Sequence, residues 1–310
     1  MNWIIFALLG AMFQAVESGI KKKALQTKGM NNVVAVIAFL VAGILFALTY
    51  AFQEGTLAPV HNLSNTFWIN LGWMVGLNII AVWFSYKALD AADLSYLMPF
   101  MTLTSLSLII PPMILLGEYP SVMSFVGITV VVVGALAMDW KGKGKLTEKE
   151  LEKRKNNRKG VLYFLATAIC YTFTPTFAKI LVVESGSALF ASYVIHLFIA
   201  IGFIPLAFLI PVAGKRSESL QIIRQNLTGK AGKTFLLATV LAGVAIAIAN
   251  GSINYALQSA TVANVFAIKR TMPLFAFLIG VFYFKERSNL TQKIIATLIM
   301  VVGAVIITLS

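Results

Sequence analysis

Ten apolar segments of about 20 residues each, separated by short polar connections, dominate the sequence. A helix needs about 20 predominantly apolar residues to cross a hydrocarbon core about 30 Å thick. Lipid cannot satisfy exposed backbone polar groups, so such segments must be helical. The predicted spans are 3–20, 32–51, 67–86, 95–116, 121–138, 161–183, 187–212, 235–256, 262–284 and 292–309. We therefore expect an all-α membrane protein with ten transmembrane helices.

Composition excludes the soluble alternatives. The chain is 59% hydrophobic and only 12% charged, with a mean hydropathy of +0.85, far outside the range of soluble domains. The longest polar connections, 140–160 and 213–234, hold about 20 residues, too few for a soluble domain. The first apolar segment has no basic residues before it, which favours a retained first span over a signal peptide. We expect a multi-pass protein of the cell (inner) membrane, and a monomer is compatible with the sequence.

Basic residues are distributed on one side of the predicted topology. The net charge is +13, and 22 of the 25 Lys and Arg residues lie in the connections that follow spans 1, 3, 5, 7 and 9. Cytoplasmic loops of membrane proteins are enriched in Lys and Arg. The excess charge therefore indicates orientation rather than nucleic-acid binding. It predicts that these connections are cytoplasmic and that both chain termini lie outside.

Three basic residues belong to no connection: Lys179, Lys269 and Arg270 lie inside predicted spans. Each costs about 2.5–3.5 kcal/mol at a helix centre unless it is paired or hydrated. Two interpretations stay open, a polar cavity that binds an anion and purely structural pairing with acids. We favour the cavity, because Glu17 is the only clear acid inside a span. Glu17 itself either pairs with Lys21, one turn away, or carries a coupling proton.

The two halves of the chain repeat a pattern. The stretch "YKALDAADLSYLMPF" aligns with "NYALQSATVANVFAI" so that Glu118 falls opposite Glu286, and each half ends in a span with a late glycine, Gly134 or Gly303. Each half has five spans, an odd number, so the halves must enter the membrane in opposite directions. This pattern predicts an inverted-topology repeat. The predicted parts are a first half at 1–140, a basic cytoplasmic linker at 141–160 and a second half at 161–310.

The repeated five-span unit, with "AL" before its fourth helix and "GE" or "KE" before its fifth, resembles the EamA-type transporters of the drug/metabolite transporter superfamily. The resemblance extends over essentially the whole chain and implies a secondary transporter. More narrowly, the "KR" of span 9 and the lysine late in span 6 resemble the sugar-phosphate/phosphate translocator branch. That resemblance implies that Lys179, Lys269 and Arg270 are ligands of a substrate anion.

Other polar residues inside the spans are candidate ligands. A stripe on one face of span 8 and its end comprises Asn250, Asn254 and Gln258, with Tyr255 beside it. A substrate-lining face and an interhelical hydrogen-bond seam both account for this stripe. Gln14 and Tyr171 are further candidates for substrate binding. Two prolines, Pro175 and Pro273, each stand four residues from a buried cation and predict helix kinks there.

The chemistry points to secondary transport. Arg presents a planar fork to carboxylate or phosphate oxygens, and Lys adds a point charge. The sequence has no P-loop, no zinc-ligand pattern and no nucleophile with its base, so we expect no cofactor, no metal and no enzyme activity. The predicted substrate is a small anionic or zwitterionic metabolite, such as an organophosphate, carboxylate or amino acid, driven by a gradient or by exchange. The alternatives are a proton-linked exporter of amino acids or drugs, a lipid-phosphate flippase, and a non-transporting membrane scaffold or receptor.

Overall fold

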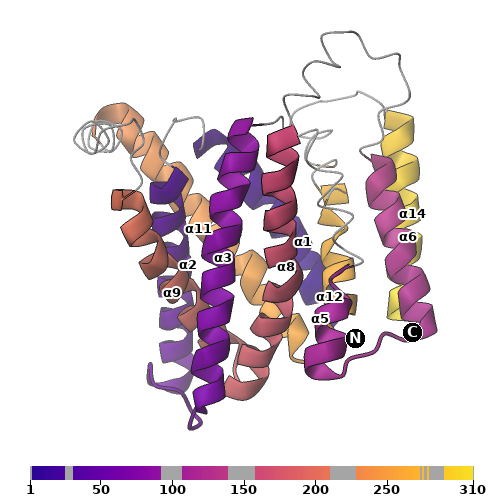
Figure 1. Ribbon diagram of the computed structural model, residues 1–310, viewed down its shortest axis with the longest axis horizontal. Helices are drawn as coiled ribbons and strands as arrows, with labels where there is room; N and C mark the ends of the chain where they lie inside the picture. Colours follow the sequence, from indigo (N-terminus) through magenta and orange to yellow (C-terminus); the bar gives the residue numbers. More distant parts are fainter. Residues whose placement is uncertain are drawn as a thin grey trace. The chain divides into compact units, whose positions relative to one another are not determined.

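The computed structural model describes residues 2–24, 31–91, 107–138, 158–209, 228–272, 274–275, 278 and 290–309, and these form helices and turns without a strand (Figure 1). The helices are α1 (Asn2–Ala24), α2 (Asn31–Glu54), α3 (Asn65–Ala91), α5 (Ile110–Leu116), α6 (Val122–Met138), α8 (Arg158–Ser185), α9 (Ala188–Leu209), α11 (Gly229–Leu257), α12 (Val262–Lys269) and α14 (Leu290–Thr308). The predicted all-helical class is confirmed for the described part of the chain.

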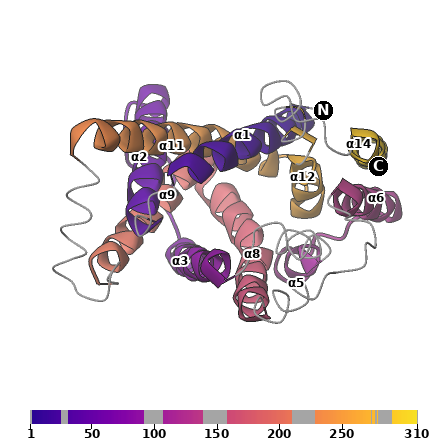
Figure 2. The ribbon, with the colours of Figure 1, turned by 90° about the horizontal axis from the view of Figure 1, so that it is seen from above.

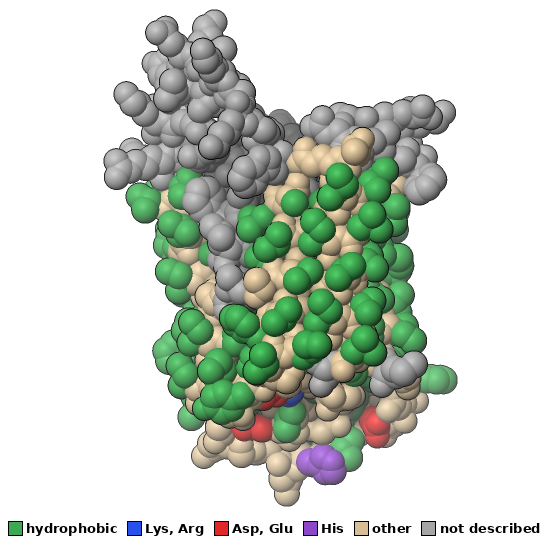
Figure 3. All heavy atoms as spheres, turned by 90° about the vertical axis from the view of Figure 1, so that its right-hand side faces the viewer, with side chains coloured by type: hydrophobic (Ala, Val, Ile, Leu, Met, Phe, Trp, Pro, Cys, Tyr) green, Lys and Arg blue, Asp and Glu red, His purple; other side chains and the backbone are tan. Residues whose placement is uncertain are grey.

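Six of these helices are long and apolar enough to cross a membrane: Asn2–Ile20, Asn32–Glu54, Asn65–Ser85, Gly160–Ser185, Ala188–Ala207 and Gly232–Leu257. Two shorter apolar helices, Val122–Ala137 and Ile294–Thr308, correspond to predicted spans 5 and 10. The predicted spans 95–116 and 262–284 lie partly outside the described residues, and α5 and α12 are their described helices. Hydrophobic side chains cover most of the described surface in Figure 3, as expected for a multi-pass membrane protein.

The helices pack into two compact units. The first comprises Met1–Ala11, Ile80–Phe177 and Ser259–Ser310, and the second comprises Met12–Ile79 and Ala178–Gln258. Each unit combines segments from the early and the late part of the chain. The division into 1–140, 141–160 and 161–310 follows the sequence repeat rather than the packing, and it stays a prediction.

In the first unit, α6 and α14 lie side by side, as Figure 1 and Figure 2 both show. Glycines bring their backbones together. A methyl group on Gly134 would lie 2.9 Å from the Met300 nitrogen, and one on Gly303 would lie 2.7 Å from the Val131 nitrogen. Interfaces between membrane helices are rich in small residues because the gain there comes from close packing. The pairing of spans 5 and 10 is therefore backbone-close and antiparallel.

In the second unit, α2 packs against α9 and α11. The α2–α9 contact is aromatic, with Phe39 stacked on Phe203 at 6.3 Å between ring centroids and Tyr50 tilted against Phe190 at 5.4 Å. Such pairs add about 0.5–1.5 kcal/mol beyond their buried area. On the other side, a methyl group on Gly243 would lie 2.7 Å from the Ala38 carbonyl oxygen, so α11 also approaches α2 closely.

Candidate functional site

Helix α12 carries two of the three predicted anion ligands, and its N-terminus is held by two side chains. The Thr261 hydroxyl accepts a hydrogen bond from the Asn264 N–H at 3.3 Å, and a carboxylate oxygen of Glu118 accepts one from the Val262 N–H at 2.9 Å. Negative charge is stabilising at a helix N-terminus, where the backbone N–H groups are unpaired. Gly117, with φ of 65°, ends α5 in a left-handed turn immediately before Glu118. That turn and the carboxylate fix where α12 begins.

The regular part of α12 ends at Lys269, inside predicted span 9. The Arg270 N–H is shared between the Phe266 and Ala267 carbonyls at 3.0 and 3.1 Å, and the Thr271 N–H bonds three residues back to Ile268 at 3.0 Å. This tightening is 3₁₀-like, and such stretches inside long helices often mark functional hinges. An interruption near this point was expected because the proline at position 273 cannot donate to the Lys269 carbonyl. Position 273 itself lies outside the described residues.

Both cations at this break are half-buried. The Lys269 ammonium lies 5.1 Å from the centroid of the Phe266 ring, within range of a cation–π interaction. Arg270 follows directly as the C-terminal cap of α12. These two residues belong to the first unit, whereas Lys179, half-buried on α8, belongs to the second. The predicted kink residue Pro175 lies inside α8 and is buried.

The polar stripe of α11 makes hydrogen bonds with α9. The Asn254 amide donates to the Ser192 hydroxyl at 2.7 Å, and the Asn250 amide lies 3.0 Å from the His196 Nε2. His196 Nδ1 lies 2.7 Å from the Ser192 carbonyl oxygen, which can only accept, so the proton sits on Nδ1. A neutral imidazole with this tautomer accepts from Asn250. Asn250 and Asn254 therefore take part in an α9–α11 hydrogen-bond seam, and a substrate-binding role for them stays a prediction.

The remaining candidates are divided between the units. Gln14 donates from its amide to the Glu17 carboxylate within α1, and Glu17 is only 3% exposed. Tyr255 is half-buried, and Gln258 is exposed as the C-terminal cap of α11. Tyr171 is half-buried on the part of α8 that belongs to the first unit. The roles of these residues stay predictions. The pairing of Glu17 with Lys21 also stays a prediction, because the Lys21 side chain lies outside the described part of the structure.

Sequence reasoning missed several polar contacts. Ser192 was not predicted to make a polar contact, although a serine four residues before a histidine on an apolar helix indicates one. The hydroxyls of Ser107 and Thr172 lie 2.9 Å apart, and the Thr167 hydroxyl bonds to the Ala81 carbonyl at 3.2 Å, which links α8 to α3. Within the described ranges, no three His, Cys, Asp or Glu side chains gather in a way that could hold a metal ion.

Comparison with known proteins gives the family. Residues 158–309 match the sequence profile of the EamA-like transporter family. The second half of the chain, residues 158–309, belongs to this family. The resemblance to EamA-type transporters of the drug/metabolite transporter superfamily is thereby confirmed. A solved crystal structure matches this EamA-like protein with a TM-score of 0.75 at 14% identity, over 100% of this chain and 98% of that chain, which shows a shared fold. No curated protein sequence matches.

Proposed function

We propose that this EamA-like protein is a secondary transporter of a small metabolite that carries a negative group. The observation that carries the proposal is the end of α12 at Lys269 and Arg270 inside a predicted span. Each cation at such a depth costs about 2.5–3.5 kcal/mol unless it is hydrated or neutralised, and an anionic substrate offsets that cost. Organophosphates, carboxylates and zwitterionic amino acids all present such a group.

The break in predicted span 9, where α12 ends at Lys269, supports this assignment. Backbone that departs from regular helix inside a membrane is tolerated where it lines a cavity or is buried in protein. Discontinuous helices at the membrane midplane form the substrate sites of many secondary transporters. Arg270 supplies the planar fork for two anion oxygens, and Lys269 supplies an adjacent point charge. Lys179, with its position beside Pro175, is the third proposed ligand.

An inverted repeat is the proposed basis of alternating access, and the antiparallel pairing of α6 with α14 is compatible with it. Gly134 meets Met300, and Gly303 meets Val131. A two-fold axis in the membrane plane that relates the two halves would make their last spans antiparallel where they meet.

Energy would come from an ion gradient or from exchange of one substrate for another at the cell (inner) membrane. Proton coupling is favoured by one observation: Glu17 is a carboxylate inside the membrane-spanning part of α1, only 3% exposed, that accepts a hydrogen bond from the Gln14 amide. A proton-linked exporter of amino acids is therefore the second candidate, with Glu17 carrying the proton.

Ligand-induced thermal stabilisation of the purified protein tests the proposal. A ligand that binds the native state raises the unfolding midpoint. A sugar phosphate, a dicarboxylate and a quaternary ammonium compound would be compared. We expect an anion to protect the wild type, Arg270→Gln to lose that protection, and Arg270→Lys to keep part of it because the bidentate fork is lost. Lys179→Gln and Lys269→Gln should also weaken protection.

The matched control is Lys233→Gln, which removes an exposed lysine near the N-terminus of α11. It should leave protection unchanged. Equal protection by the anion in the wild type and in all three buried-cation variants would refute the anion site. Protection by the quaternary ammonium compound alone would refute the proposed substrate class.

A further inference from the structure

A turn inside predicted span 4 lies beside α8. The described helix of this span, α5, begins at Ile110, after a turn at residues 108 and 109. Just before the turn, the Ser107 hydroxyl lies 2.9 Å from the hydroxyl of Thr172, which stands at the middle of predicted span 6. The part of α8 that carries Thr172 belongs to the same packing unit as α5, and the two helices lie side by side in Figure 1 and Figure 2.

The residues after this turn present backbone carbonyl oxygens and lack two N–H groups. Pro111 and Pro112, near the start of α5, have no N–H. They therefore cannot donate to the carbonyls four residues earlier, which are those of Ser107 and Leu108. A carbonyl oxygen has two lone pairs, so it can bind a cation even where it also accepts one hydrogen bond. This stretch is thus richer in acceptors than in donors.

Hydroxyl oxygens add to these acceptors. Thr172 donates its single proton to the Ala168 carbonyl at 2.9 Å, so Ser107 is the donor between the two hydroxyls. Thr176 follows one helical turn after Thr172 and lies on the same face of α8. It is 0% exposed, and its hydroxyl has no hydrogen-bond partner within the described part of the chain. Burying an unsatisfied hydroxyl is costly, which indicates that this oxygen serves a ligand.

The direction of the chain brings these oxygens together. Each predicted span reverses the chain, so spans 4 and 6 cross the membrane the same way. Since Ser107 meets Thr172, the residues 108–111 follow in the direction in which α8 continues to Thr176. Pro175 cannot donate to the Tyr171 carbonyl, so α8 also presents a backbone oxygen in this turn. The junction is a set of neutral oxygens inside the predicted membrane region.

Neutral oxygens of this kind suit a small monovalent cation. Hard cations prefer oxygen ligands, and the usual protein sites of divalent ions include carboxylates. The hydroxyls and carbonyls of this junction carry no formal charge, which favours an ion of single charge. In secondary transporters, backbone carbonyls at irregular points of membrane helices coordinate sodium.

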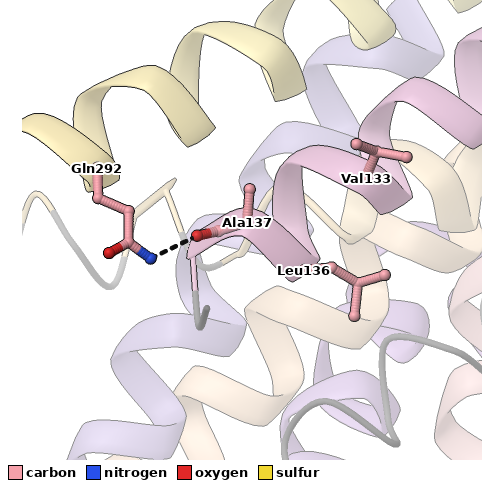
Figure 4. A pocket seen from close by; sticks show the side chains of 4 residues that line it. All are labelled: Val133, Leu136, Ala137 and Gln292. Carbon is pink, nitrogen blue, oxygen red and sulfur yellow. Dashed lines mark hydrogen bonds between the residues drawn. The ribbon is translucent and has the colours of Figure 1, made fainter. Parts of the chain in front are cut away.

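The groove between α6 and α14 is a poorer candidate for such an ion. It encloses about 390 Å³ and is lined by Val133, Leu136, Ala137 and Gln292 (Figure 4). Three of these four side chains are apolar. The Gln292 amide donates to the Ala137 carbonyl oxygen at 2.8 Å, so the polar side chain is already engaged by the opposite helix.

We propose that a sodium ion binds at the junction of α5 and α8, held by the hydroxyls of Ser107, Thr172 and Thr176 and by carbonyl oxygens of the turn before α5. The site is separate from the proposed anion site at Lys269 and Arg270, and sodium binding does not depend on it. Only a role of this sodium ion in driving transport rests on the proposed function.

The test compares the unfolding midpoints of the purified full-length protein in sodium, potassium and choline chloride at equal concentration, with no substrate added. A cation that binds the native state stabilises it, so sodium should raise the midpoint by several degrees over choline, and the effect should saturate. Potassium should raise the midpoint less, because the larger ion fits the same oxygens less well.

Thr176→Val removes one ligand oxygen with little change of shape and should abolish most of the sodium effect. In choline this variant should be at least as stable as the wild type, because the lost hydroxyl has no partner in the described structure. The matched control is Thr239→Val on α11, in the other packing unit. Thr239 is also 0% exposed and donates to the Phe235 carbonyl at 2.8 Å. Its replacement should keep the full sodium effect.

Ser107→Ala covers the case in which Thr176→Val does not fold, and it should also reduce the sodium effect. Equal midpoints of the wild type in sodium and choline would overturn the proposal. So would a full sodium effect in Thr176→Val, or an equal loss of the effect in Thr239→Val. A potassium effect as large as that of sodium would overturn the assignment to sodium. Arg270→Gln should keep the sodium effect even where it loses anion protection, which separates this test from that of the substrate site.

Discussion

Replacing Glu118 with alanine should destabilise the start of α12, although the two elements it joins are far apart in the sequence. The Glu118 carboxylate accepts a hydrogen bond from the Val262 N–H at 2.9 Å. This bond joins the α5–α6 connection to the start of α12. Removing it leaves a half-buried helix terminus with the weaker Thr261 cap, whose bond to Asn264 is 3.3 Å long. The substitution therefore removes both an acceptor and a charge.

The size of the effect follows from these two losses. A hydrogen bond to a charged group contributes about 1.5–3 kcal/mol, and a charge at a helix N-terminus about 0.3–1 kcal/mol. Glu118 is partly exposed and Thr261 remains, so we expect the lower end, about 1–2 kcal/mol, for Glu118→Ala. Glu118→Gln keeps an acceptor and should lose only the charge, about 0.3–1 kcal/mol. For a chain of this size, about 1 kcal/mol corresponds to a change of about 2–4 °C in unfolding midpoint.

Thermal unfolding of the purified protein, followed by intrinsic fluorescence, measures this change. The control is Glu54→Ala, because Glu54 is an exposed carboxylate at the end of α2 that accepts a 3.0 Å hydrogen bond from the neighbouring Gln53 amide. Its removal should change stability by less than about 0.5 kcal/mol. If Glu118→Ala and Glu54→Ala lowered the midpoint equally, the capping role of Glu118 would be wrong.

Three further outcomes are expected. Gly134→Leu should destabilise the protein by about 1–3 kcal/mol through overpacking, since the new Cβ would lie 2.9 Å from a backbone nitrogen of α14. The control Gly76→Leu should fold normally, because nothing lies within 4 Å of its Cβ. The unfolding midpoints of the two variants test this prediction. Asn254→Leu should cost about 0.6–1.7 kcal/mol through loss of its bond to Ser192, again seen in the midpoint, and anion protection should persist if the residue serves only the seam. Glu17→Gln should abolish pH-dependent uptake into proteoliposomes while exchange at symmetric pH continues; unchanged pH dependence would assign Glu17 a structural role.

Local patterns in the sequence predict the helices well and their ends less well. The apolar run 32–51 predicts α2 to within a few residues, because continuous apolar sequence of that length has one stable form in lipid. α3 continues to Ala91, past the predicted end at 86, since a helix does not stop where its apolar run stops. The break after Lys269 lies where the proline at position 273 was expected to disturb span 9, whereas α8 continues through Pro175, so a proline alone does not decide where a membrane helix breaks.

Contacts between distant segments could not be read from one sequence. The sequence places Glu118 opposite Glu286 in the repeat, but no local pattern says that its carboxylate meets Val262. The stripe of Asn250 and Asn254 was visible, whereas the choice between a substrate face and a seam depended on which residues of α9 face it. The Asn254 amide bonds to Ser192 of α9, so the stripe takes part in an interhelical seam. Helix packing, and not the local sequence, places Ser192 opposite Asn254.

The close antiparallel packing of α6 and α14 has a thermodynamic consequence for the proposed transport cycle. If the two halves are related as an inverted repeat, exchange of their conformations turns each contact of α6 with α14 into the equivalent contact of α14 with α6. The pair would then have nearly the same energy in the outward-open and inward-open states, and it would anchor the fold without favouring either direction. The resting equilibrium would be set by contacts outside this pair.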